Sequence, residues 1–268
     1  MTDMDRVQGF PLDAAGVDIF RAPPPVERRW EWDGVDRDSR QTTTRQSGLP
    51  LIMLNSVPAV PDFGPERITE LQIKRVIDVA ASLLALFVLM PLLVLCALMI
   101  KITSPGPVFF RQQREGLDGR LFEVLKFRSM HVAAGDASGV AQTVENDPRV
   151  FPLGRFLRKT SIDELPQLIN VLRGDMSLVG PRPHVPGMNA AGVSYRELVP
   201  YYDLRLRVLP GVTGWAQANG FRGPTDNAGR AKARVDHDIA YVCNFSVWLD
   251  IKIILLTIRK EFVVGSGH

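Results

Sequence analysis

An acidic pair, Asp163-Glu164, is the part of the sequence that most directly suggests a reaction. Apolar residues recur at three- and four-residue spacing through the stretch 160–174, which predicts a helix ending before Gly174. The pair lies in the first turn, near the positive end of the helix dipole, which should keep both carboxylates ionised. An ionised carboxylate suits a nucleophile or a Mg²⁺ ligand and does not suit a general acid. The pattern therefore points to phosphoryl chemistry.

A purely structural interpretation of the same pair is strong. Ser161 and Glu164 match a capping box, and acidic residues in a first turn stabilise many helices. Pro166 fits more easily into a helix that Asp163 itself caps. Either register places both carboxylates at the same end of the helix.

Four cations accompany the pair in the sequence. Lys126 and Arg128 share one face of a predicted strand, Arg158 lies just before the helix, and Arg182 is held between two prolines. Paired cations suit phosphate, although Lys and Arg can equally form the solvated side of a strand. We expect Arg158 to reach the acidic pair.

A glycine-punctuated loop, 213–220, carries Gly214, Trp215 and Asn219. Glycine-lined backbone beside a rigid arginine suits a pyrophosphate, while Trp215 can also be an anchor in the core. Upstream, the segments 108–114 and 120–128 flank a Gly116-Leu-Asp-Gly119 turn, which predicts a β-hairpin at the start of the soluble part.

The run 79–100 contains 22 residues without a charge, roughly 33 Å of helix, which is membrane length. Pro91 lies near its middle and should kink it. Cations flank the run on both sides, which favours two cytoplasmic ends and a re-entrant hairpin over a straight span. A span remains open, as does the partner of Asp78, for which Arg75 and a cation at headgroup level are the candidates.

Composition limits the alternatives. The 268 residues are 46% hydrophobic and 23% charged, as in ordinary globular proteins, and a net charge of +3 is too small to argue for nucleic acid. Cys96 and Cys243 form neither a disulfide framework nor a zinc pattern, which fits a reducing, cytoplasmic-facing body. Residues 1–65 lack periodicity and resemble no targeting peptide, so we expect a mostly disordered extension.

In order along the chain, these stretches resemble the bacterial sugar transferase family, the monotopic phosphoglycosyl transferases. The resemblance covers roughly residues 71–262 and rests on seven segments: Lys74-Arg75-x-x-Asp78, 109–117 (FFRQQREGL), 126–130 (KFRSM), 158–167 (RKTSIDELPQ), 174–183 (GDMSLVGPRP), 210–220 (PGVTGWAQANG) and 249–253 (LDIKI). It implies a mainly helical α+β fold, with a re-entrant membrane helix over 66–103. A cytoplasmic catalytic domain would occupy 104–268, with a short β-hairpin and interfacial amphipathic helices.

The resemblance also implies an activity at the cytoplasmic face of the bacterial inner membrane. A hexose 1-phosphate, glucose or galactose by the wording of the loop after Trp215, would pass from a UDP-sugar to undecaprenyl phosphate, with release of UMP, as the first step of exopolysaccharide or capsule assembly. Asp163 would be the nucleophile that forms a phosphosugar-aspartyl intermediate. Glu164 would be its partner, and both carboxylates would be candidate ligands of Mg²⁺.

The same resemblance implies phosphate- or nucleotide-binding roles for seven residues: Lys126, Arg128, Arg158, Arg182, Gly214, Trp215 and Asn219. The sequence departs from the family at the helix break, where a Ser-Pro pair is common and Met90-Pro91 stands here. It also departs in its N-terminal extension, which could form a homodimer or dock a polymerisation partner.

Two further stretches could bind the lipid surface, namely 151–157 and an amphipathic segment over 245–262 with Trp248 and Leu255 on its apolar face. Each could instead face the core. Two rival functions need less of the pattern: a membrane-anchored scaffold, which would be indifferent to Asp163→Asn, and a Mg²⁺-dependent phosphohydrolase, which would need no lipid.

Overall fold

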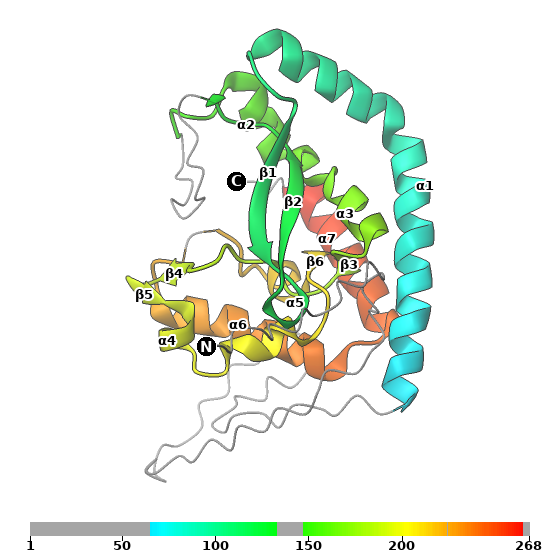
Figure 1. Ribbon diagram of the computed structural model, residues 1–268, viewed down its shortest axis with the longest axis vertical. Coiled ribbons are helices and arrows are strands. Elements are labelled where there is room, and N and C mark those ends of the chain that lie inside the picture. The colour runs from blue at the N-terminus through cyan, green and yellow to red at the C-terminus, as the bar shows by residue number, and fades with distance from the viewer. Residues whose placement is uncertain (1–64, 133–146, 224, 265–268) are drawn as a thin grey trace, which may run out of the picture. The chain divides into compact units, whose positions relative to one another are not determined.

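The computed structural model describes residues 65–132, 147–223 and 225–264. The predicted extension over 1–65 lies almost wholly outside the described residues. The fold is mainly helical with small two-stranded sheets, as predicted (Figure 1). In chain order its elements are α1 (Pro65–Thr103), β1 (Phe109–Glu115), η1 (Leu117–Gly119), β2 (Leu121–Phe127), α2 (Pro152–Lys159), η3 (Ile162–Glu164), α3 (Gln167–Arg173), β3 (Ser177–Val179), β4 (Asn189–Ala190), β5 (Val193–Ser194), α4 (Tyr195–Leu198), η4 (Tyr202–Arg207), β6 (Gly211–Thr213), α5 (Trp215–Ala218), α6 (Ala228–Asn244) and α7 (Val247–Val264).

Helix α1 is a single helix of 39 residues that continues through Pro91. The predicted break is therefore a bend: Figure 1 shows the later part of α1 turning over the end of the β-hairpin. Proline removes one backbone donor and crowds the preceding turn, which bends a helix without ending it when the neighbouring turns persist. Over Arg67–Thr103 this helix is long and apolar enough to cross a membrane.

The two faces of α1 are inverted relative to a helix on a soluble protein. Near its N-terminal end, the residues buried against the protein are polar: Lys74, Asp78 and Ser82. The outward side is apolar. Its large exposed side chains are Ile73, Val76, Ile77, Leu83, Leu84, Phe87, Val88, Met90, Val94, Leu95, Leu98, Met99 and Ile102. An apolar surface of this extent marks a site of membrane or protein contact.

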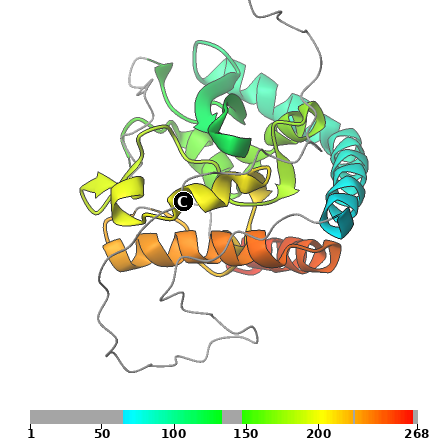
Figure 2. The same cartoon turned by 60° about the horizontal axis from the view of Figure 1, so that its bottom comes forward.

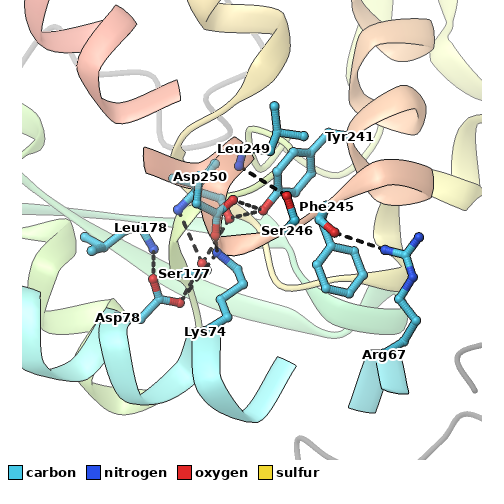
Figure 3. Close-up of polar contacts among 11 residues, drawn as sticks. Arg67, Lys74, Asp78, Ser177, Leu178, Tyr241, Phe245, Ser246, Leu249 and Asp250 are labelled. Atoms are coloured by element: carbon cyan, nitrogen blue, oxygen red, sulfur yellow. Dashed lines mark hydrogen bonds and ion pairs between the residues drawn. The ribbon is translucent and has the colours of Figure 1, made fainter. Parts of the chain in front are cut away.

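A buried polar cluster attaches the N-terminal half of α1 to the rest of the fold (Figure 3). Lys74 Nζ lies 2.6 Å from a carboxylate oxygen of Asp250 in α7, whose other oxygen accepts a 2.7 Å hydrogen bond from the Tyr241 hydroxyl. Asp78 accepts hydrogen bonds from the Ser177 hydroxyl and the Leu178 backbone N–H, at 2.7 and 3.2 Å.

Asp78 therefore holds the start of β3, and its nearest cation is Lys74, at 3.8 Å. The suggested pairing with Arg75 is wrong. Arg75 instead donates to the carbonyls of Val171 and Leu172, where α3 ends with its unpaired carbonyl groups.

The C-terminal half of α1 packs on the same body by apolar contacts. Cys96 and Ile100 join a buried cluster with Phe127, Phe151 and Leu157. Most of the stretch 151–157 thus serves the core, which corrects its interpretation as a lipid-facing segment; of its large apolar side chains, Phe156 alone is exposed.

The β-hairpin forms as predicted, with Phe109 paired to Phe127 and Glu115 to Leu121 around the turn η1. Farther along, β3 and β6 pair in parallel, and α6 lies along one side of the body in both views (Figure 2). From the end of α6, α7 runs back towards α5 and buries Ile253, while Trp248, Ile251, Leu255 and Ile258 stay exposed. Ile254, next to the exposed Leu255, packs against the core.

Candidate active site

The acidic pair lies in a short turn between two helices. Ser161 has left-handed backbone angles (φ 54°, ψ 16°) that end the path of α2, and Asp163-Glu164 follow in the 3₁₀ turn η3 before α3 begins at Gln167. The predicted helix over 160–174 is thus shorter and starts later. Neither predicted cap forms, because neither η3 nor α3 has a side-chain cap hydrogen bond. The predicted end at Gly174 (φ 93°) is confirmed.

Glu164 is fixed by cations from two other segments. Lys126 of β2 donates to its Oε1 at 2.7 Å, and Arg182 donates to Oε2 at 3.1 Å and to Oε1 at 2.5 Å. Such a bidentate contact fixes direction as well as distance. Although burial opposes it, Arg182 and Lys126 hold the pKa of Glu164 well below its usual value. This carboxylate is ionised and fully engaged.

Asp163 has a different environment. It is 7% exposed, and the described part of the chain provides no hydrogen bond or ion pair to its carboxylate. Burial, and then the charge of Glu164, raise its pKa to about 6, while the nearby charges of Lys126, Arg158 and Arg182 oppose the rise. The shift is upward, whereas a helix terminus would lower the pKa of Asp163. Asp163 remains mostly ionised at neutral pH, without hydrogen bonds that would weaken it as a nucleophile.

The predicted phosphate cations separate into two groups. Lys126, Arg158 and Arg182 all act on Asp163 electrostatically, as expected, and Arg158 Nη1 lies 3.5 Å from the Ser129 hydroxyl. Arg128 does not join them. Its guanidinium donates to the backbone carbonyls of Ser104 and Pro105, just after α1, and the residue is buried there. Arg128 therefore holds the C-terminal end of α1 to the hairpin.

The loop over 213–220 is built into the core. A side chain at Gly214 would meet the Gly180 carbonyl oxygen at 2.2 Å, so glycine is needed for close approach of two backbones. Trp215 packs against a buried cluster that includes Val179, with Lys252 Nζ 5.9 Å from its ring centre. Asn219 donates to the Trp215 carbonyl at 2.8 Å. These contacts are structural, and a role in nucleotide binding stays a prediction.

Sequence reasoning missed residues that position the site. Asn170, fully buried in α3, accepts a hydrogen bond from the Leu125 N–H at 2.9 Å and donates to the Glu123 carbonyl at 2.7 Å. The side-chain amide of Asn170 thus forms the hydrogen bonds that a neighbouring strand would form along the free edge of β2. These bonds fix the position of Lys126, the next residue of β2, beside Glu164. The sequence signal was an asparagine within the apolar residues of a predicted helix, which indicates a buried polar side chain with specific partners.

Two arginines that sequence reasoning also missed, Arg205 and Arg114, hold the backbone at Arg182. Arg205 forms a buried ion pair with Asp238 of α6, with nitrogen to oxygen distances of 3.0 and 2.8 Å, and donates to the Arg182 carbonyl. Arg114 of β1 donates to the Pro183 carbonyl at 3.1 Å, and burial together with the charge of Arg182 lowers its pKa to about 10. Two successive backbone carbonyls, those of Arg182 and Pro183, are therefore each bound by an arginine.

The site thus presents one free buried carboxylate beside a fixed one, within a group of cations that suits phosphate. Consistent with this, the bacterial sugar transferase family model matches residues 69–263, and the chain belongs to this family.

Three relatives with high sequence identity show which members of the family this chain resembles. The exopolysaccharide production protein PSS of Rhizobium leguminosarum bv. phaseoli is 52% identical over 198 residues, which are 74% of this chain and 99% of the relative. UDP-glucose:undecaprenyl-phosphate glucose-1-phosphate transferases of Caulobacter vibrioides and Escherichia coli are 50% and 49% identical, over 73% and 80% of this chain. These matches cover 72% of the Caulobacter relative but only 46% of the Escherichia coli one, so the chain spans about half the length of the latter.

Proposed function

We propose that this chain transfers glucose 1-phosphate from UDP-glucose to undecaprenyl phosphate, releases UMP and so begins the assembly of an exopolysaccharide repeat unit. The names of the relatives support the reaction and the donor, and the Rhizobium relative, matched over nearly its whole length, supports the role in exopolysaccharide production. The observation that carries the proposal is the contrast within the acidic pair, where Glu164 is held by two cations and Asp163 is free.

Asp163 acts as the nucleophile in this proposal. Its carboxylate oxygen bonds to the β-phosphorus of UDP-glucose while the bond from that phosphorus to the bridging oxygen breaks, and the electron pair leaves with UMP. An oxygen of the lipid phosphate then attacks the same phosphorus and frees Asp163. Dividing the transfer into two displacements lets one carboxylate serve both substrates. Lys126, Arg158 and Arg182 offset the charge of the phosphates throughout.

Mg²⁺ would assist by offsetting phosphate charge when it is bound. The described residues contain no cluster of three or more metal-ligating side chains, which fits a Mg²⁺ ion held by one carboxylate, substrate phosphates and water. Of the two predicted ligands, Asp163 is available, whereas both oxygens of Glu164 already accept hydrogen bonds from Arg182 and Lys126. Asp163, and not Glu164, would therefore hold the ion together with the substrate.

The pKa of Asp163 predicts the acid side of the pH profile. Because the nucleophile must be ionised, kcat/KM should fall tenfold per pH unit below about pH 6. The stability of the fold should depend on pH in the opposite sense to the activity. Since the folded state keeps this proton after the unfolded chain has lost it, stability falls as pH rises from about 4 to 6. A profile that is flat down to pH 5 in folded protein would contradict the assignment.

We also propose that α1 enters and leaves the bilayer on the cytoplasmic side. Support comes from the attachment of both halves to one body, through Lys74 and Asp78 at one end and Cys96 and Ile100 at the other. A helix that spans the bilayer would carry its two ends to opposite faces.

Cysteine labelling tests this topology. In a chain whose natural cysteines are replaced by serine, Glu70→Cys and Asp118→Cys should each react in inverted vesicles and stay unlabelled in intact cells by a membrane-impermeant maleimide. Labelling of residue 70 from the periplasm would replace the hairpin with a span.

Release of UMP by the detergent-solubilised full chain tests the reaction and the donor together. With Mg²⁺ and undecaprenyl phosphate, UDP-glucose should give UMP, and UDP-galactose and UDP-N-acetylhexosamines much less. Omission of the lipid should stop turnover after one equivalent at most. Continued release of free hexose phosphate without lipid would indicate a phosphohydrolase, and no release from any donor would favour a scaffold.

A further inference from the structure

Helix α6 carries a buried arginine that has no counter-ion within the described residues. Arg234 is 7% exposed, its Nη2 donates to the Gly223 carbonyl at 2.7 Å, and its Nε has no hydrogen-bond partner. Taking a guanidinium out of water is costly unless an anion pairs with it. A buried cation of this kind is therefore a candidate ligand-binding group.

The nearest carboxylate on the same face of α6 is already used. Asp238, one helical turn beyond Arg234, is bound by Arg205 through two nitrogens, and Arg205 also donates to the Arg182 carbonyl. Burial lowers the pKa of Arg234; the nearby charge of Asp238 opposes this shift, and the charges of Arg182 and Arg205 add to it. Arg234 is thus part of the cationic group that reaches the acidic pair through Arg182.

The other side chain at the centre of this group cannot balance the charge. His184 is buried, and burial together with four surrounding arginines, Arg205, Arg234, Arg114 and Arg182, holds its pKa well below the usual value. The imidazole is therefore neutral. Its Nδ1 is 2.9 Å from the Tyr202 hydroxyl, and its Nε2 has no partner. Asp238 pairs with Arg205 and Glu164 pairs with Arg182. Arg234 and Arg114 are left without an ion pair among the described residues, so the group has a surplus of positive charge.

We propose that Arg234, with Arg182 and Arg114, forms a second phosphate subsite beside the acidic pair. It would bind a phosphate monoester, from the leaving nucleotide or from the lipid acceptor. This inference rests on the proposed function, since a two-step transfer presents the site with one phosphate that stays on Asp163 and another that leaves or arrives. Lys126 and Arg158 lie near the first. Arginine suits the second because its planar fork binds phosphate through two nitrogens.

The simpler alternative is that Arg234 only orders the loop 220–223. Arg230, one turn earlier on α6, does this from an exposed position, with Nη2 3.2 Å from the carbonyl oxygens of Gly220 and Arg222. Arg230 is therefore a matched control: the same residue type on the same helix, bound to the same loop, without burial.

Binding of UMP and of uridine to the solubilised full chain separates the two roles, because the ligands differ only by the phosphate. Arg234→Gln should weaken the affinity for UMP roughly tenfold to a hundredfold, as loss of a charge-assisted contact implies, and should leave the affinity for uridine unchanged. Arg230→Gln should leave both affinities unchanged. If Arg234→Gln fails to fold, Arg234→Lys, which keeps the charge and loses the fork, should show a smaller loss confined to UMP.

The KM for undecaprenyl phosphate, measured in the same variants, identifies the source of the phosphate. A selective loss for UMP, for the lipid phosphate or for both would support the subsite. Equal weakening of UMP and uridine, or no change in UMP affinity and lipid KM, would overturn it and leave Arg234 as a loop contact. Failure of the proposed function looks different, since the wild-type chain itself would then release no lipid-dependent UMP.

Discussion

Asp163→Asn should abolish transfer, reducing lipid-dependent UMP release by at least about a thousandfold, since an amide cannot form the phosphosugar intermediate. The fold should survive the change. Burial already disfavours the charged form of Asp163, with its pKa raised to about 6, so a neutral isostere removes a cost rather than a contact.

The controls follow from the same geometry. The melting temperature of Asp163→Asn should equal or exceed that of the wild-type chain, and membrane association should persist because η3 lies outside α1. Glu164→Gln is the companion variant: it should lower kcat while disturbing Lys126 and Arg182, which would lose their shared ionised partner. Retention of more than a few per cent of activity by Asp163→Asn would remove it as the nucleophile.

The second large effect is on stability. Arg205→Met should destabilise the protein by about 3–5 kcal/mol, because it leaves Asp238 buried without its partner. For a chain of this size that corresponds to a drop in melting temperature of roughly 6–20 °C. Activity should fall further than stability alone explains at a temperature where the variant is folded, since Arg205 also holds the Arg182 carbonyl.

An exposed ion pair provides the comparison. Arg196 and Asp203 lie 2.9 Å apart with side chains 46% and 66% exposed, so Asp203→Asn should change stability by less than about 1 kcal/mol. Replacing both members of the buried pair with apolar residues, Arg205→Met with Asp238→Leu, should recover much of the lost stability. A small effect of Arg205→Met in scanning calorimetry would mean that the pair is solvated.

Local patterns were enough to predict several elements. The hairpin followed from two strand-like segments around a glycine-bounded turn, and β1 and β2 pair antiparallel across that turn. The apolar run predicted α1 by its length, and Gly174 predicted the end of α3 by its tolerance of left-handed angles. Each of these features depends on one continuous stretch of the sequence.

The missed features depend on partners far along the chain. Nothing near Ser161 indicates that its backbone turns left-handed and divides the predicted helix, because φ > 0 is unusual for serine. Lys126 and Arg128 share a strand face by spacing, yet one meets Glu164 and the other the carbonyls after α1. The fold, and not the strand pattern, decides which cation reaches the acidic pair.

The pKa of Asp163 shows the same limit. The sequence places it at a helix terminus, where local dipoles favour the charged form, while burial and an adjacent ionised glutamate dominate in the folded chain. Local electrostatics therefore predicted the direction of this pKa shift incorrectly.

Trapping the covalent intermediate tests directly whether Asp163 is the nucleophile. The solubilised full chain is incubated with UDP-glucose and Mg²⁺ without lipid, quenched and digested for mass spectrometry. We expect one hexose phosphate on the peptide that contains Asp163, about one equivalent of UMP, and loss of the adduct when undecaprenyl phosphate is added. An unmodified Asp163 peptide in protein that still transfers glucose 1-phosphate to the lipid would contradict it.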